Sequence, residues 1–195
     1  MDKYSVALGV FEELLDALRQ KEDPKQEEKD TPEWGSFESA VEFVLAHEGR
    51  YANDPVDPGG ETHWGISKRS YPHIDIKNLT REEAIEIYRK DWWDKYQYHQ
   101  IEDITIATKV FDFAVNMGAT PAHRLLQRSL HAAGQRHVVI DGIIGPQTLT
   151  ATNEADPKLV LGAIRAEAAH YYGRLIERNA SLKRFEEGWT NRAYA

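Results

Sequence analysis

The chain is organised around one stretch, His47-Glu48-Gly49-Arg50-Tyr51-Ala52-Asn53-Asp54-Pro55-Val56-Asp57-Pro58-Gly59-Gly60-Glu61-Thr62-His63-Trp64-Gly65-Ile66. A carboxylate at the end of an apolar periodic segment precedes a loop with three acids, two Pro and two adjacent Gly, followed by a hydroxyl and an aromatic side chain. Cleavage of a glycosidic bond needs a proton-donating carboxylic acid in partly apolar surroundings, with polar groups nearby that position water and stabilise an oxocarbenium-like transition state. The pattern predicts a sugar-cleaving cleft with Glu48 as the proton donor.

The segment before Glu48 has the pattern of a helix. Ser36 is placed to cap its N-terminus, and Gly49 stands where a helix should stop. Apolar residues recur between them at helical spacing, at Phe37, Val41, Val44 and Leu45. We therefore expect Glu48 in the last turn of this helix, facing the loop.

Most of the remaining chain also shows helical periodicity. Thr80-Arg81-Glu82-Glu83 has the form of a capping box, and Pro takes the first helical position after Gly145 and after Asp156. Only residues 64–67 and 138–140 are short and β-branched enough to suggest strands. The sequence predicts a mostly α fold with at most a small β-hairpin near the active-site loop.

Composition limits the classes of protein that this chain can represent. Its 195 residues, 41% of them hydrophobic, suffice for one enzyme-sized core with little left for a second full domain. Cysteine is absent, which excludes disulfides, thiolate metal sites and cysteine nucleophiles. The net charge of −8 argues against a nucleic-acid partner, because nucleic-acid binding depends on Lys and Arg contacts to phosphate.

Metal and cofactor binding are not expected either. Histidine and acidic residues crowd the loop 47–63, but their spacing matches neither a helical zinc motif nor a calcium-binding loop. The paired Gly59-Gly60 fits a tight turn and matches no nucleotide-binding fingerprint.

Residues 1–33 differ from the rest of the chain. Their first half has the apolar spacing of a short amphipathic helix, and residues 20–33 read as a charged linker. The N-terminus does not fit a secretory signal, and its apolar run is too short and too charged to form an integral membrane segment. We expect an arm that docks on its own domain or is loosely ordered, with a partner-binding or membrane-surface helix as the alternative. The acidic face of the helix disfavours anionic lipid.

Several later segments follow the opening stretch in a specific order, namely Ile87-Tyr88-Arg89, Trp92-Trp93-Asp94, Phe111–Asn116, Asp141–Leu149 and Gly188–Arg192. Together with His47–Ile66, they resemble glycoside hydrolase family 108, the bacterial and phage N-acetylmuramidases of the lysozyme-like superfamily. The resemblance implies a lysozyme-like helical domain that hydrolyses the β-1,4 bond between N-acetylmuramic acid and N-acetylglucosamine. It also implies that Glu48 is the proton donor and that peptidoglycan glycan strands are the partner.

The resemblance further suggests how the chain is divided. Residues 1–33 form the N-terminal helix and linker, and residues 34–117 form the catalytic muramidase region. Residues 118–195 resemble the accompanying peptidoglycan-binding region, which we expect to pack on the same body.

Arg50 departs from the family pattern, because the family has a second Gly at this place. A guanidinium paired with Glu48 would favour the ionised carboxylate and would oppose its use as an acid. We therefore expect Arg50 to point away from Glu48, toward lactyl or peptide carboxylates of the substrate.

The second carboxylate of the reaction has two candidates. Asp57 lies nine residues after Glu48, which is similar to the spacing of the two acids in phage lysozymes, where a Thr follows as Thr62 does here. Thr62 is therefore a further catalytic candidate, whose hydroxyl would orient the 2-acetamido group or a water. Asp54 competes with it, and the third alternative is that neither acid is catalytic, because an Asp before Pro commonly initiates a turn. Whether the reaction retains or inverts the anomeric centre depends on the carboxylate separation and stays open.

Four residues are candidates for binding the substrate, namely Tyr51, Asn53, Trp64 and Asn116. Sugar rings lie well on aromatic faces, but Tyr51 and Trp64 equally suit an anchoring role in the loop. Asn116 lies four residues after Asp112 on the same helical face, so a buried hydrogen bond between these two side chains is its alternative.

Three functions fit these observations. The first is a peptidoglycan N-acetylmuramidase of the endolysin type, made in the cytoplasm without a signal peptide and acting in the periplasm or cell wall after release by a holin-like or other export route. The second is a lytic transglycosylase, which also uses a single acid but forms anhydro-muramic products. The third is a non-catalytic wall-binding or export-associated protein.

Overall fold

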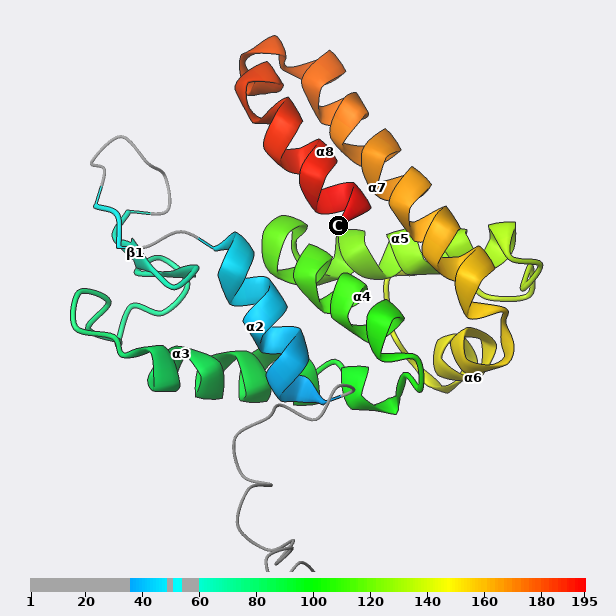
Figure 1. Ribbon diagram of the computed structural model, residues 1–195, viewed down its shortest axis with the longest axis horizontal. Coiled ribbons are helices and arrows are strands. Elements are labelled where there is room, and N and C mark those ends of the chain that lie inside the picture. The colour runs from blue at the N-terminus through cyan, green and yellow to red at the C-terminus, as the bar shows by residue number, and fades with distance from the viewer. Residues whose placement is uncertain (1–35, 49–50, 54–59) are drawn as a thin grey trace, which may run out of the picture. The chain divides into compact units, whose positions relative to one another are not determined.

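The computed structural model describes residues 36–48, 51–53 and 60–195. The predicted N-terminal helix and linker, residues 1–33, lie outside this range. The described residues form helices and one small sheet (Figure 1). The helices are α2 (Phe37–His47), α3 (Arg81–Tyr88), α4 (Ile104–Met117), α5 (Ala119–Ala132), α6 (Pro146–Glu154), α7 (Pro157–Arg178) and α8 (Glu186–Tyr194). The prediction of a mostly α, lysozyme-like fold is confirmed.

Helix α2 forms as its apolar spacing predicts. Ser36 is the N-cap with extended backbone, and Phe37, Val41, Val44 and Leu45 are all buried. The helix ends at His47, so Glu48 lies one residue beyond the last turn in which we expected it. Its backbone N–H still donates to the Val44 carbonyl at 3.1 Å, while its φ of −87° and ψ of 140° turn the chain out of the helix.

A small hairpin is present as predicted, but the expectation of a strand over residues 64–67 was wrong for Trp64 and Gly65, which form its turn. Strand β1 (Thr62–His63) pairs antiparallel with β2 (Ile66–Ser67), with Thr62 opposite Ser67 and His63 opposite Ile66. The two residues of the turn, Trp64 and Gly65, have φ values of 53° and 77°. A two-residue hairpin turn with positive φ at both positions matches the right-handed twist of its strands. The expectation of a strand at residues 138–140 was wrong, since these residues lie in a loop. Val138 is buried there, and its two apolar neighbours are exposed.

Helix α3 begins with the predicted capping box. The Thr80 hydroxyl accepts from the Glu83 backbone N–H at 3.2 Å, and the Glu83 carboxylate accepts from the Thr80 N–H at 2.9 Å. The helix continues into a π-helical turn, η1 (Arg89–Asp94), and a 3-10 turn, η2 (Tyr98–Gln100), follows. The adjacent Trp92 and Trp93 of η1 differ in burial: Trp93 is buried and Trp92 is only partly buried.

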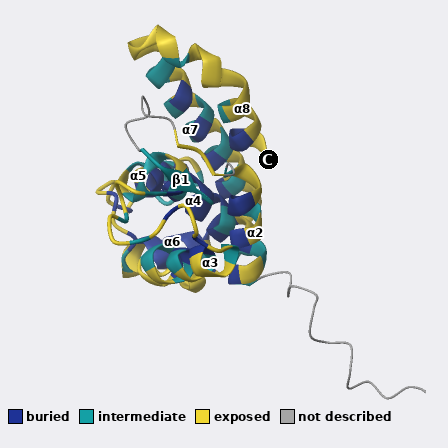
Figure 2. Cartoon of the chain, turned by 90° about the vertical axis from the view of Figure 1, so that its left-hand side faces the viewer, coloured by how far each residue is buried: buried dark blue, intermediate teal, exposed yellow. Residues whose placement is uncertain are grey.

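The core beneath these elements is aromatic. Phe111 on α4 has no exposed surface, and its ring centroid lies 5.6 to 6.4 Å from those of Phe37, Tyr88, Trp93 and Tyr98. Aromatic rings at these separations add to the stabilisation that burial of their surface provides. Figure 2 shows the buried residues on the helix faces that point toward one another. Helix α4 thus joins α2, α3 and the turns after α3 into one core.

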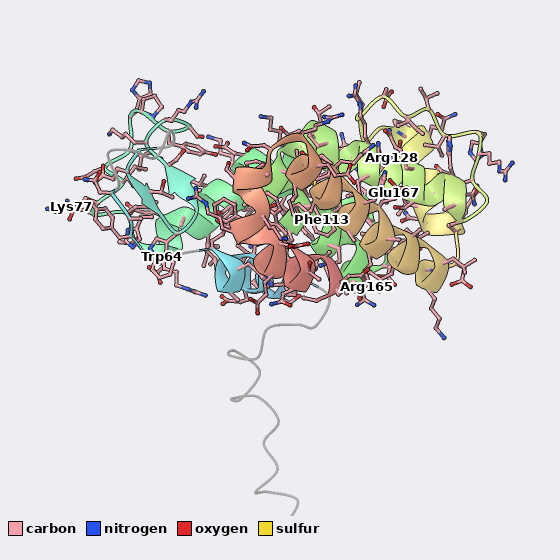
Figure 3. All side chains as sticks on the ribbon, turned by 90° about the horizontal axis from the view of Figure 1, so that it is seen from above. Trp64, Lys77, Phe113, Arg128, Arg165 and Glu167 are labelled. Carbon is pink, nitrogen blue, oxygen red and sulfur yellow. The ribbon has the colours of Figure 1, made fainter. Side chains whose placement is uncertain are left out.

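Helices α5 to α8 pack on the other side of α4. Gly118, with φ of 91°, lies between the end of α4 and the start of α5. Helices α6 and α7 each begin with the expected Pro. Helix α7 runs along α5 and α8, and Arg128 on α5 donates to Glu167 on α7 at 2.7 Å (Figure 3). A further 3-10 turn, η3 (Ala180–Phe185), reverses the chain into α8. The end of α8 is thereby brought to α4. The predicted division at residues 117 and 118 stays a prediction.

Candidate active site

Glu48 lies where the end of α2 meets the turn of the hairpin. A Cβ atom at Gly65 would lie 2.9 Å from both Cγ and Oε2 of Glu48, and it would collide with the Tyr88 hydroxyl. These separations are shorter than any van der Waals contact, so only glycine fits beside the acid. The turn of the hairpin therefore forms one wall of the Glu48 site.

Tyr88 holds this wall to helix α3. Its hydroxyl donates to the Trp64 carbonyl at 2.9 Å, and its ring is almost fully buried. Burial first, and the charge of Glu48 second, raise the pKa of the Tyr88 hydroxyl well above its ordinary value. Tyr88 therefore remains a neutral hydrogen-bond donor at physiological pH. Its hydrogen bond to Trp64 positions the hairpin turn next to Glu48.

Arg192 of α8 forms the other side of the site. Its Nη2 atom donates to Glu48 Oε1 at 2.6 Å, and its Nε atom donates to the two carboxylate oxygens of Asp112 at 3.1 and 3.2 Å. The side chains of Arg192 and Glu48 are 9% and 19% exposed, whereas that of Asp112 is fully buried. We call this arrangement of Glu48, Arg192 and Asp112 the Arg192 clamp.

The clamp joins segments far apart in the chain. Glu48 follows α2, Asp112 lies on α4, and Arg192 lies near the end of α8. Ion pairs of a guanidinium with carboxylates are short and directional, so they fix the acid more tightly than packing alone. The position of the Glu48 carboxylate therefore depends on the C-terminal helix.

Lys109 bonds to the backbone of the clamp residue Arg192. Its Nζ atom is buried and donates to the Arg192 backbone carbonyl at 2.6 Å. Burial lowers the pKa of Lys109 to about 8, although the nearby charge of Asp112 opposes this shift. Burial disfavours the charged form of Asp112 too, and it therefore raises the pKa of this carboxyl. The adjacent positive charges of Arg192 and Lys109 oppose that rise.

Arg192 bonds to two carboxylates, and its bonds to the buried Asp112 do not involve Glu48. An unpaired buried charge costs several kcal/mol, and Asp112 keeps Arg192 paired. Of the two carboxylates, Asp112 is thus the permanent partner of Arg192, and the partly exposed Glu48 is the one suited to chemistry.

Three of the predicted site residues form hydrogen bonds to other residues of the loop region. The Trp64 indole N–H donates to the Leu79 carbonyl at 3.3 Å, which is the anchoring role weighed for it. Tyr51 is exposed, and its hydroxyl donates to Glu61 at 2.9 Å. The Thr62 hydroxyl donates to the Gly60 carbonyl at 3.3 Å. Their predicted roles with substrate stay predictions.

The two predicted amide residues are both exposed. Asn53 follows the isolated bridge between Ala52 and Thr62. Asn116 lies in the last turn of α4, and its Oδ1 atom accepts from the Tyr172 hydroxyl at 2.8 Å. Asp112 is instead occupied by Arg192, so the hydrogen bond between Asn116 and Asp112 that we weighed as an alternative is not formed.

Three predictions fall on residues outside the described part of the chain. Arg50, Asp54 and Asp57 belong to the segments 49–50 and 54–59, so their predicted roles stay predictions. Within the described residues, no group of three or more His, Asp or Glu side chains is arranged to hold a metal ion. None of the described helices has the length and apolar character needed to cross a membrane.

Sequence reasoning missed the functional importance of Asp112 and Arg192. Both lie in segments that carry the family resemblance, but their separation of 80 residues gave no local signal. Asp112 did carry one hint, because it stands in the apolar run Phe111-Asp112-Phe113-Ala114, and a charged residue on a buried helix face needs a partner.

The helical fold is lysozyme-like, and it holds one partly exposed carboxylate between a helix end, a small hairpin and a guanidinium. Comparison with protein families agrees: residues 41–118 match glycosyl hydrolase 108, and residues 121–194 match a predicted peptidoglycan domain. These two matches, in this order, support a glycoside hydrolase that acts on peptidoglycan.

A solved structure shares this architecture. The chain is similar to SagA of Brucella abortus, with 26% sequence identity and a TM-score of 0.66, over 82% of this chain and 90% of SagA. A search of curated proteins finds no match.

Proposed function

We propose that this protein hydrolyses the β-1,4 bond between N-acetylmuramic acid and N-acetylglucosamine in peptidoglycan, with Glu48 as the general acid. The observation that carries this proposal is the place of Glu48, which lies beside the hairpin turn and is the most exposed member of the Arg192 clamp, at 19%. A guanidinium bonded to the acid opposes its proton-donating form, as argued above for Arg50, so the proposal requires Arg192 to release Oε1 when the substrate binds. The matches to glycosyl hydrolase 108 and to a predicted peptidoglycan domain support the substrate class.

Glu48 and Arg192 each have one task in the proposed reaction. Protonated Glu48 gives its proton to the glycosidic oxygen as the bond from that oxygen to the muramic C1 breaks. Water then supplies the hydroxyl that ends on C1 and the proton that restores the acid, so one water is consumed per bond. Arg192 stabilises the carboxylate that Glu48 becomes after giving up its proton, because its Nη2 already donates to Oε1.

The test is mass spectrometry of purified peptidoglycan digested with wild type, Glu48→Gln and Glu42→Gln. Glutamine keeps the shape of the acid but has no proton to give. We expect reducing-end muramic acid products from the wild type and a loss of about 100-fold or more in Glu48→Gln. Glu42 is exposed on the same helix and pairs with Arg81, so its variant controls for the loss of a surface carboxylate and should keep full activity.

Two outcomes would overturn the proposal. Anhydro-muramic products from the wild type would show a lytic transglycosylase. No fragments from the wild type, together with intact binding to sacculi, would show a wall-binding protein without this activity.

A further inference from the structure

A pocket of about 460 Å³ lies next to the Arg192 clamp. One side comes from the ends of α2 and α4, and the other comes from η3 and α8. The side chains that matter here are those of His47, Asn116, Arg184, Trp189, Asn191 and Arg192. Because Arg192 also bonds to Glu48, the pocket and the proposed acid share one residue.

The free positive charge of this pocket comes from Arg184. The described residues that line the pocket include two Arg and no Asp or Glu. Arg192 is already bonded to the carboxylates of Glu48 and Asp112. Arg184 is exposed, its guanidinium lies 4.7 Å from the centroid of the Phe185 ring, and no described acid forms an ion pair with it. The pocket therefore favours an anionic ligand.

The neutral side chains of the pocket add hydrogen-bond donors. The Asn116 carbonyl oxygen already accepts from Tyr172, so the group that Asn116 still offers is its amide nitrogen. Asn191 is exposed on α8 beside it and offers a second amide. Such donors suit carboxylate and peptide carbonyl oxygens.

Trp189 gives the pocket a rigid aromatic wall. Its ring stacks on Tyr172 with centroids 5.0 Å apart and planes 16° apart, and Phe185 packs against it at 5.6 Å. An aromatic wall held from two directions loses little conformational entropy when a ligand binds. The pocket is thus ready to receive a ligand with both polar and apolar groups.

We infer that this pocket binds the lactyl and peptide substituent of N-acetylmuramic acid, an inference that rests on the proposed function. That substituent carries the carboxylate and the amide carbonyls that a strand of N-acetylglucosamine alone does not have. Its binding next to Arg192 brings the muramic sugar, and not its neighbour, to the acid. Arg184 is the residue that distinguishes the two kinds of strand.

The experiment measures binding by titration calorimetry in the full chain carrying Glu48→Gln, so that ligands are not consumed. The ligands are a disaccharide muropeptide with its stem peptide and, for comparison, a tetramer of N-acetylglucosamine. Arg184→Gln is added to this background in one protein. Arg178→Gln is added in another as the matched control, because Arg178 is also exposed in the C-terminal region but does not line the pocket.

We expect Arg184→Gln to weaken muropeptide binding about tenfold, which is the size of one lost charge-assisted hydrogen bond. The same change should leave the N-acetylglucosamine tetramer unaffected, and Arg178→Gln should affect neither ligand. The inference is wrong if the muropeptide does not bind, if all three proteins bind it equally, or if Arg184→Gln weakens both ligands to the same extent. Because binding is read without turnover, these results are independent of whether the wild type cleaves peptidoglycan.

Discussion

Gly65→Ala tests whether the turn of the hairpin sets the position of Glu48. Gly65 has φ of 77°, and the added methyl would meet the Glu48 side chain and the Tyr88 hydroxyl. A non-glycine residue in this backbone region costs about 1–2 kcal/mol. Overpacking against side chains that are themselves held in place adds about 1–3 kcal/mol. The free energy of unfolding should therefore fall by about 2–5 kcal/mol.

Activity should fall as well, because the methyl can be accommodated only if Glu48 or Tyr88 moves. Glu48 is the more exposed of the two, so we expect the displacement to fall on Glu48. A displacement of about 1 Å at a catalytic group costs on the order of 100-fold in rate. Folded Gly65→Ala protein should thus hydrolyse purified sacculi about 100-fold more slowly than the wild type.

Gly134→Ala is the matched control for backbone strain. Gly134 has φ of 97°, but an added Cβ would meet no atom within 4 Å. This variant should lose only the strain of about 1–2 kcal/mol and should keep its activity. Urea denaturation followed by tryptophan fluorescence gives both stabilities, and release of reducing ends from sacculi gives both rates. Wild-type activity in folded Gly65→Ala, or an equal loss of activity in Gly134→Ala, would refute the reasoning.

Two further predictions concern the charges behind Glu48. Asp112→Asn leaves Arg192 with Glu48 as its carboxylate partner, so it should lower the free energy of unfolding in urea denaturation by about 1.5–3 kcal/mol, the cost of lost hydrogen bonds to a charged group. Glu167→Gln, which breaks the partly exposed pair with Arg128, should cost less than about 1 kcal/mol. Equal losses would contradict a special role for the clamp. Lys109→Met should change how stability depends on pH. Because burial lowers the pKa of Lys109 from 10.5 to about 8, the unfolded chain binds a proton between these pH values that the folded chain does not. Wild-type stability should therefore rise by about 3 kcal/mol relative to Lys109→Met from pH 8 to 10.5, and parallel curves would contradict it.

Local patterns predicted most of the helices well. The capping box at Thr80 and the Pro residues that open α6 and α7 act within one helical turn, so their effect can be read without knowledge of the fold. A small hairpin was predicted as well, although Trp64 and Gly65 were expected in a strand and form its turn. The interpretation of residues 138–140 as a strand failed because β-branched residues alone do not provide a neighbouring strand to pair with.

The sequence by itself determined the mostly α fold, the hairpin and the choice of Glu48 as the candidate acid, because each depends on residues close together in the chain. Only the tertiary structure decided which groups surround that acid. Asp112 and Arg192 are 80 residues apart, and Arg192 and Glu48 are 144 apart. Their pairing exists only because α7 and η3 return α8 to the end of α4. A buried charge must find an opposite charge, but the sequence does not state which distant residue supplies it.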